Sequence, residues 1–135
     1  MMYETEEDRE NEQAIIQAWV NHYKPSLEIK KMPIDYEMDF ALVDHDGLAA
    51  VVEVKKRKKL YDPVILSTRK FFMARQFEES GIAAFFIVQA PIDEEEKILW
   101  YRFKDAALEM TYGGRASRQK QEPLVLIPKK KFQIL

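Results

Sequence analysis

One stretch of the chain, residues 38–55, constrains the fold most because its pattern is typical of two strands joined by a tight turn. Asp46-Gly47 supplies the turn, since glycine reaches positive φ without steric cost and an Asp-Gly pair between apolar runs is a strong hairpin signal. Residues 48–54 form an almost unbroken apolar run, which is typical of a strand covered on both faces. We therefore predict strands at residues 36–43 and 48–55.

Charged side chains lie within this otherwise apolar hairpin. Side chains alternate between the two faces of a strand, so Glu53 and Lys55 project to the same side. Asp39 lies on the partner strand, where the hairpin can bring it near them. Because unpaired buried charges are costly, these three groups need a chemical reason to be there.

The arrangement resembles the D…E-x-K signature of the PD-(D/E)XK nuclease superfamily, which includes restriction endonucleases, Holliday-junction resolvases and many phage nucleases. Asp39 is followed by a glycine turn, by an apolar strand that ends in Glu53-Val54-Lys55, and by a basic run. Met38, rather than proline, precedes Asp39, and this leaves Asp35 as a rival for the first acidic position. We prefer Asp39, because it lies on the strand that pairs with Glu53.

The resemblance implies a divalent metal, Mg²⁺ or Mn²⁺, and catalytic roles for Asp39, Glu53 and Lys55. It also implies that the metal is held by the two carboxylates, by the backbone carbonyl of Val54 and by a glutamate of the first helix. Carboxylate and carbonyl oxygens are the ligands that hard cations such as Mg²⁺ prefer. Lys55 would then orient or help deprotonate the attacking water, or offset charge on the phosphate.

The first predicted helix, residues 6–23, carries an apolar stripe at helical spacing that includes Ile15 and Ile16. Glu12 lies along this stripe, one turn before these two residues. In many nucleases that the chain resembles, a glutamate of the first helix joins the metal site, so we take Glu12 as the further metal ligand and Asp8 as the fallback. The alternative interpretation of Glu12 is an acidic residue that serves solubility and the helix dipole.

Basic side chains gather directly after the hairpin, although the formal net charge of the chain is only −2. Such a patch can hold a phosphate backbone even when the net charge is near zero. A solvated charged face is the alternative interpretation, and the neighbouring E-x-K strand favours nucleic acid. The residues that we predict to bind DNA are Lys56, Arg57, Lys58, Lys59, Arg69 and Lys70.

The remaining elements predict an α/β fold with an αβββαβ core of the restriction-endonuclease-like kind, in a single domain over residues 1–135. A strand–helix–strand step implies at least one parallel pair, so we expect a mixed central sheet flanked by helices. The further predicted elements are a strand at 26–31, a helix at 62–79 with a core face of Ile65, Phe72, Met73 and Phe77, strands at 82–90 and 98–103, a helix at 104–112 and an edge strand at 124–127.

The chain lacks cysteine and any apolar run of the roughly 20 residues that a membrane helix needs. We therefore expect a cytoplasmic protein without a membrane partner and read both histidines, His22 and His45, as surface residues. The predicted function is a metal-dependent endonuclease acting on DNA and selective for branched substrates, for which a homodimer would be suitable. The alternative is an inactive subunit of the same fold that binds nucleic acid or a protein partner.

Overall fold

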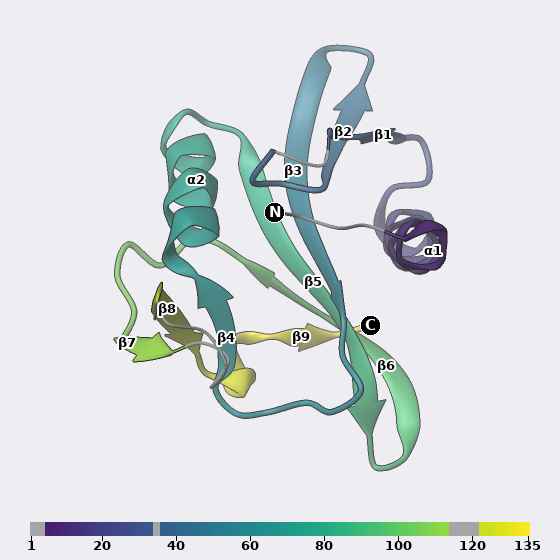
Figure 1. Ribbon diagram of the computed structural model, residues 1–135. Coiled ribbons are helices and arrows are strands. Elements are labelled where there is room, and N and C mark those ends of the chain that lie inside the picture. The colour runs from purple at the N-terminus through teal and green to yellow at the C-terminus, as the bar shows by residue number, and fades with distance from the viewer. Residues whose placement is uncertain (1–4, 34–35, 114–121) are drawn as a thin grey trace.

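The computed structural model describes residues 5–33, 36–113 and 122–135 (Figure 1). Within these ranges the chain forms two α-helices, nine strands and one short 3₁₀ helix. In chain order these are α1 (Glu6–Tyr23), β1 (Glu28–Lys31), β2 (Phe40–Asp44), β3 (Gly47–Lys56), β4 (Val64–Ser67), α2 (Thr68–Glu79), β5 (Ala83–Ile92), β6 (Glu95–Arg102), β7 (Met110–Gly113), β8 (Glu122–Ile127), η1 (Lys129–Lys131) and β9 (Gln133–Ile134).

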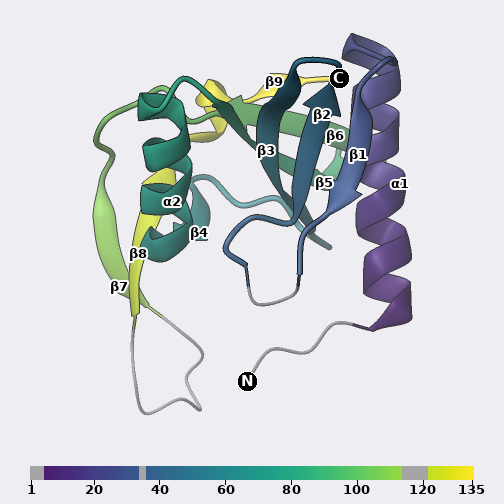
Figure 2. The same cartoon turned by 90° about the horizontal axis from the view of Figure 1, so that it is seen from above.

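The central sheet has six strands in the order β1-β2-β3-β5-β6-β9. Its β3–β5 pair is parallel, and the other pairs are antiparallel, so the sheet is mixed as predicted. The helices α1 and α2 lie on opposite sides of this sheet, which Figure 2 shows from above. The predicted α/β class, with a mixed sheet flanked by helices, is therefore confirmed.

Two apolar clusters, one on each face of the sheet, hold the helices in place. Val51 of β3 packs in the cluster that contains Phe71 of α2, whereas Val52 and Val54 pack in the cluster that contains Ile16 of α1. Successive side chains of β3 thus point alternately to α2 and to α1. Glu53 shares the face of Val51, and this alternation directs its carboxylate toward α2.

The predicted helix at residues 62–79 is wrong in its first part, because residues 64–67 form β4 and α2 begins at Thr68. β4 pairs with β8, a strand some sixty residues later, and this pairing buries Val64 and Leu66 while Ile65 stays exposed. Ser67 caps α2, since its Oγ accepts a hydrogen bond from the Lys70 backbone N–H.

Two of the four residues predicted for the core face of this segment lie outside the core. Ile65 and Phe72 are exposed, and the buried residues of α2 include Phe71 and Ala74 instead. Met73 and Phe77 are only half-buried and pack at the margin of the core.

Two further corrections concern the C-terminal part of the chain. The predicted helix at residues 104–112 does not form, and Met110–Gly113 is strand β7. The predicted edge strand at 124–127 lies within β8, which is the middle strand of a separate three-stranded sheet in the order β4-β8-β7. β8 gains its second neighbour, β4, from a segment that is distant in the sequence, and this is why it is not an edge strand.

The predicted strand at residues 36–43 also starts later, at Phe40. Met38 is therefore not part of the strand, and its side chain is buried in the core cluster on the α2 side of the sheet. No helix among the described residues is long and apolar enough to cross a membrane.

Candidate active site

Glu53 is a fully buried carboxylate in the middle of the sheet. Its Oε2 lies 2.8 Å from Lys70 Nζ and 3.4 Å from Lys55 Nζ, in two ion pairs. Burial, together with the nearby charge of Asp39, raises the pKa of Glu53 to about 7, and the two lysines only partly offset this rise. Among the described residues, Glu53 Oε1 accepts no hydrogen bond. A buried oxygen without a protein partner is unusual and needs an explanation, such as a bound ion or an ordered water.

Asp39 lies directly before β2 and is fixed by the backbone of β3. Its N–H donates to the Val52 carbonyl (2.9 Å), and its Oδ2 accepts from the Val54 N–H (2.8 Å). The Val52 carbonyl and the Val54 N–H therefore point to the side of β3 on which Asp39 lies. In a strand, the N–H and the carbonyl of one residue point to the same side, so the Val54 carbonyl also points toward that side. The structure thus holds Asp39 against the backbone of β3 and near Glu53.

A further lysine, Lys31 of β1, lies between the carboxylates of Glu12, the predicted ligand, and Asp39 and forms an ion pair with each. Lys31 Nζ lies 3.9 Å from Glu12 Oε1 and 3.9 Å from Asp39 Oδ1. It also lies 5.0 Å from the centre of the Phe40 ring. Lys31 is opposite Phe40 in the β1–β2 register, so only the strand pairing places it here. Sequence reasoning missed this lysine because no local motif marks it.

Asp8 and Asp35 are the alternatives to Glu12 and Asp39 as acidic residues of the site. The side chain of Asp8 forms a capping box with Thr5 at the start of α1, where its Oδ2 accepts the Thr5 N–H. This contact accounts for Asp8 as a helix cap and makes it a poor fallback for Glu12. Asp35 lies outside the described residues.

The site therefore combines three acidic side chains with three basic ones. Each ammonium lies within 4 Å of a carboxylate oxygen, and the carboxylates come from α1, β3 and the entry to β2. Such a cluster of hard oxygen donors fits a divalent cation of the Mg²⁺ type. The residues in question are Glu12, Asp39 and Glu53 with Lys31, Lys55 and Lys70.

The family model described as "Phage putative PDDEXK endonuclease" matches residues 1–135. The chain belongs to this family. A structure of Hjc from Archaeoglobus fulgidus, described as a Holliday junction resolvase from an archaeal hyperthermophile, is similar in fold, with a TM-score of 0.53 and 14% identity over 90% of this chain and 88% of Hjc. No curated protein matches the sequence. The predicted membership of the PD-(D/E)XK superfamily is confirmed, and the family assignment supports a nuclease.

The residues predicted to bind DNA fall into two groups. Lys56 to Lys59 are exposed at the end of β3 and in the following loop. On α2, the largely exposed Arg69 donates a hydrogen bond to the Glu37 carboxylate. The side chain of Lys70 is only 23% exposed, and its Nζ contacts Glu53 of the candidate active site and the Glu37 backbone carbonyl.

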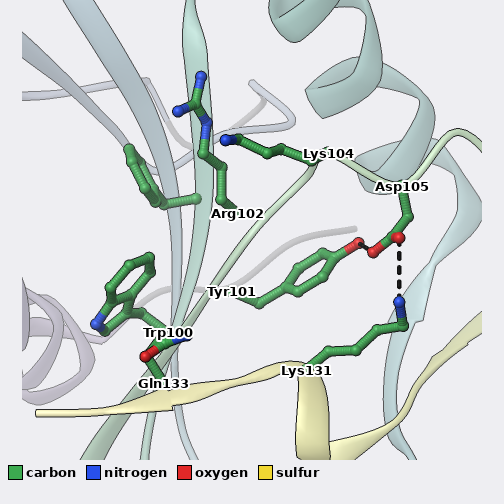
Figure 3. Close-up of a pocket in the computed structure, with 8 residues that line it drawn as sticks. Trp100, Tyr101, Arg102, Lys104, Asp105, Lys131 and Gln133 are labelled. Carbon is green, nitrogen blue, oxygen red and sulfur yellow. Dashed lines mark hydrogen bonds and ion pairs between the residues drawn. The ribbon is translucent and has the colours of Figure 1, made fainter.

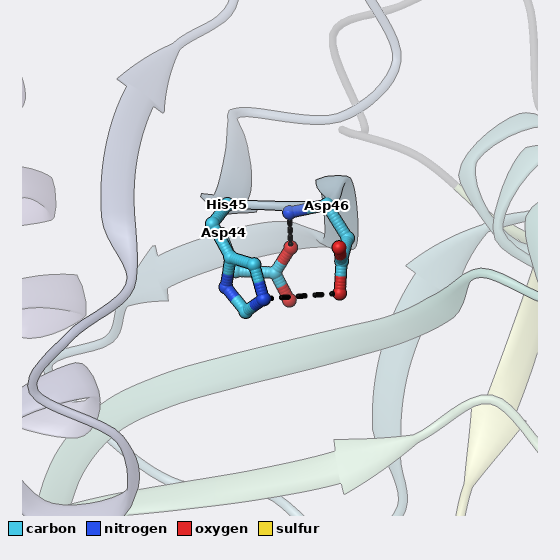
Figure 4. A group of neighbouring side chains, drawn as sticks. All are labelled: Asp44, His45 and Asp46. Carbon is cyan, nitrogen blue, oxygen red and sulfur yellow. Dashed lines mark hydrogen bonds and ion pairs between the residues drawn. The ribbon is translucent and has the colours of Figure 1, made fainter.

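A second acidic group lies in the β2–β3 turn, at the far end of the hairpin from Asp39 (Figure 4). It consists of Asp44, His45 and Asp46, whose ligand-type atoms lie within 4.8 Å of one another. The Asp46 N–H donates to Asp44 Oδ1 (2.8 Å), and His45 Nε2 lies 3.3 Å from Asp46 Oδ2. These are ordinary contacts of an exposed turn, and His45 is at the surface as predicted.

A cavity of about 470 Å³ lies beside β6 and β9 (Figure 3). Three of its four charged side chains, those of Arg102, Asp105 and Lys131, form ion pairs with one another or with a neighbour. Asp105 accepts a hydrogen bond from the Tyr101 hydroxyl (2.6 Å) and pairs with Lys131 (3.0 Å), while Arg102 pairs with Glu78. Among the described residues, no buried side-chain polar atom that lines this cavity lacks a hydrogen-bond partner, whereas Glu53 Oε1 does, so the cluster around Glu53 is the better candidate for the active site.

Proposed function

We propose that the protein is an Mg²⁺- or Mn²⁺-dependent endonuclease that hydrolyses DNA at the cluster formed by Asp39, Glu53 and Lys55. The observation that carries this proposal is the state of Glu53. Its carboxylate is fully buried, faces two lysines and a second carboxylate, and has an Oε1 without a hydrogen-bond donor among the described residues. In a purely structural ion pair, we would expect both buried carboxylate oxygens to have hydrogen-bond partners.

The donor set fits a hard divalent cation. The residues that would hold it are Asp39, Glu53, the backbone carbonyl of Val54 and, from α1, Glu12. When bound, such a cation supplies an activated water and stabilises charge on the transferring phosphate. Val54 N–H holds Asp39 Oδ2, so the carboxylate keeps its orientation without the cation.

The two lysines beside Glu53 would act differently. Lys55 is 36% exposed and can reach from Glu53 toward a phosphate or a water at the site. Lys70 is held from two sides, because its Nζ contacts Glu53 Oε2 and donates to the Glu37 backbone carbonyl at 3.3 Å. We therefore assign the catalytic role to Lys55 and a positioning role, toward Glu53, to Lys70.

The exposed basic run after β3 would bind the phosphate backbone. Removal of one lysine–phosphate ion pair should reduce the slope of log K against log salt by about 0.9, so the double change Lys58→Gln and Lys59→Gln should reduce it by about 2. Fluorescence anisotropy with labelled duplex DNA at several salt concentrations measures this slope. Lys97→Gln, which changes a lysine paired with Glu95 in the β5–β6 hairpin, is the matched control and should leave the slope unchanged. An unchanged slope in the double variant would remove the run from the DNA interface.

We further propose selectivity for branched DNA and action as a homodimer, so that two sites meet two strands. Membership of the phage endonuclease family and the likeness in fold to Hjc support this choice of substrate class. Cleavage of single-stranded, duplex, flap and four-way-junction DNA, each with Mg²⁺, with Mn²⁺ and with EDTA, tests the function. We expect metal-dependent cutting, fastest on a branched substrate. Salt-sensitive binding without cutting of any substrate would instead establish the inactive scaffold.

A further inference from the structure

Lys31 has no role in the proposed reaction, although it contacts two of the proposed metal ligands. Its Nζ lies 3.9 Å from Glu12 Oε1 and 3.9 Å from Asp39 Oδ1. Both contacts are longer than a hydrogen bond, so charge rather than directed bonding accounts for them. The ammonium of Lys31 is therefore a cation that the protein itself supplies to this pair of carboxylates.

The backbone of Lys31 is fixed beside the site, whereas its side chain reaches solvent. Lys31 ends β1, where it is opposite Phe40 in the register with β2. The N–H of the next residue, Met32, donates to the Asp39 carbonyl (2.8 Å). The Lys31 side chain is 31% exposed, so its ammonium can leave the two carboxylates without opening the core, and the residue still stays next to Asp39.

An open cavity next to Lys31 gives its side chain room to move. β1 runs beside α1 (Figure 2), and a cavity of about 620 Å³ is lined by Lys31 and by one side of this helix. The helix contributes Arg9 and Gln13 to the lining, together with the acidic Glu6 and Glu10. Lys31 therefore connects the carboxylates of the site with an accessible surface.

The charges of the site favour an exchange of cations at this position. With all six side chains ionised, the three carboxylates of the site balance its three lysines. A divalent cation would add two positive charges and would neutralise the carboxylates that Lys31 contacts. The excess positive charge would then suit the phosphate backbone of DNA.

We propose that Lys31 is displaced from Glu12 and Asp39 when a divalent cation binds, and that it then holds a phosphate of the DNA substrate. The inference rests on the proposed function and adds a substrate-binding residue to it. A lysine suits both positions because its ammonium is a compact charge on a flexible stem. If Lys31 served only to hold β1 against α1, its loss would misalign the two carboxylates and weaken metal binding.

Lys31→Gln tests the exchange, and Lys30→Gln is the matched control. Lys30 is the preceding residue of β1, so it lies on the opposite face, and it pairs with Glu28 (2.8 Å) in an exposed contact. The first readout is the affinity for Mn²⁺ without DNA, measured by calorimetry. The second is the slope of log K against log salt for duplex DNA, measured by fluorescence anisotropy in EDTA and in Ca²⁺. Ca²⁺ also prefers oxygen ligands, and calorimetry gives the concentration that fills the site.

We expect Lys31→Gln to bind Mn²⁺ roughly tenfold more tightly than the wild type, because the metal no longer has to displace an ammonium. The slope of Lys31→Gln should equal that of the wild type in EDTA, where Lys31 is held by the carboxylates. In Ca²⁺ the slope should be smaller than that of the wild type by about 0.9, which corresponds to one lost phosphate contact. Lys30→Gln should leave the Mn²⁺ affinity, and the difference between the slopes in Ca²⁺ and EDTA, unchanged.

Unchanged or weaker Mn²⁺ binding by Lys31→Gln would overturn the exchange. Tighter binding with a wild-type slope in Ca²⁺ would overturn the phosphate contact, and with it the proposal. Failure of the wild type to bind Mn²⁺ would instead refute the metal site of the proposed function, and the exchange with it. A wild type that binds Mn²⁺ but cuts no DNA would refute the endonuclease alone, because neither readout for Lys31 depends on cleavage.

Discussion

Replacing Lys55 by alanine is expected to slow cleavage of bound DNA by about a thousandfold. The Lys55 ammonium lies 3.4 Å from Glu53 Oε2 and is partly open to solvent, so it is placed to orient a water or to neutralise charge on the phosphate. Lys70 is held by Glu53 and by the Glu37 carbonyl and cannot replace it without breaking these contacts. Single-turnover kinetics at saturating enzyme, with Mg²⁺, measure the chemical step alone.

Lys56→Ala provides the contrast for this experiment. Lys56 is the next residue of β3, exposed and on the opposite face from Lys55. Its loss should weaken DNA binding and leave the rate of cleavage of fully bound DNA within a few-fold of the wild type. If Lys55→Ala cleaves bound DNA as fast as the wild type, Lys55 has no catalytic role. Thermal unfolding of each variant checks that the fold is retained.

The free energy of unfolding of the metal-free protein should fall by about 3 kcal/mol between pH 4.5 and a pH just above 7. Burial raises the pKa of Glu53 from 4.5 to about 7, and each unit corresponds to about 1.4 kcal/mol. A group with a raised pKa in the folded state stabilises the fold below its unfolded pKa, and this contribution is lost as the pH rises through the folded value. Urea titrations in EDTA across this pH range measure the effect.

Glu53→Gln should remove most of this pH dependence, since the amide does not ionise. Glu78→Gln is the matched control. Contacts with Arg102 and with the Ala84 N–H lower the pKa of Glu78, so its contribution is lost only as the pH falls below about 4.5. Glu78→Gln should therefore keep the decrease between pH 4.5 and 7. An equal decrease in Glu53→Gln would mean that another group causes it.

The parts of the fold that could be predicted are those fixed by local chemistry. Asp46-Gly47 and the apolar run after it predict the β2–β3 hairpin, and the stripe around Ile15 and Ile16 predicts α1. The hairpin also brings Asp39 near Glu53, which the sequence pattern predicts. The exact register depends on a shift between Leu42 and Val43, which the Asp46-Gly47 turn does not encode.

The parts that could not be predicted depend on pairing between distant segments. Asp62-Pro63 predicts a helix start, but residues 64–67 form a strand instead because they pair with β8. The alternation of buried Val64, exposed Ile65 and buried Leu66 is typical of a strand, and the proline before it obscures that pattern. Lys31 enters the site only through the β1–β2 register, which no local pattern encodes.

Binding of Mn²⁺ to the DNA-free protein, measured by calorimetry at pH 8, tests the proposed metal site most directly. We expect one class of binding site that is lost in Glu53→Gln and in Asp39→Asn, because both carboxylates would be ligands. Asp44→Asn, in the acidic turn at the far end of the hairpin, should bind Mn²⁺ as the wild type does. Wild-type binding by Glu53→Gln, or loss of binding in Asp44→Asn alone, would contradict a metal site at Asp39 and Glu53.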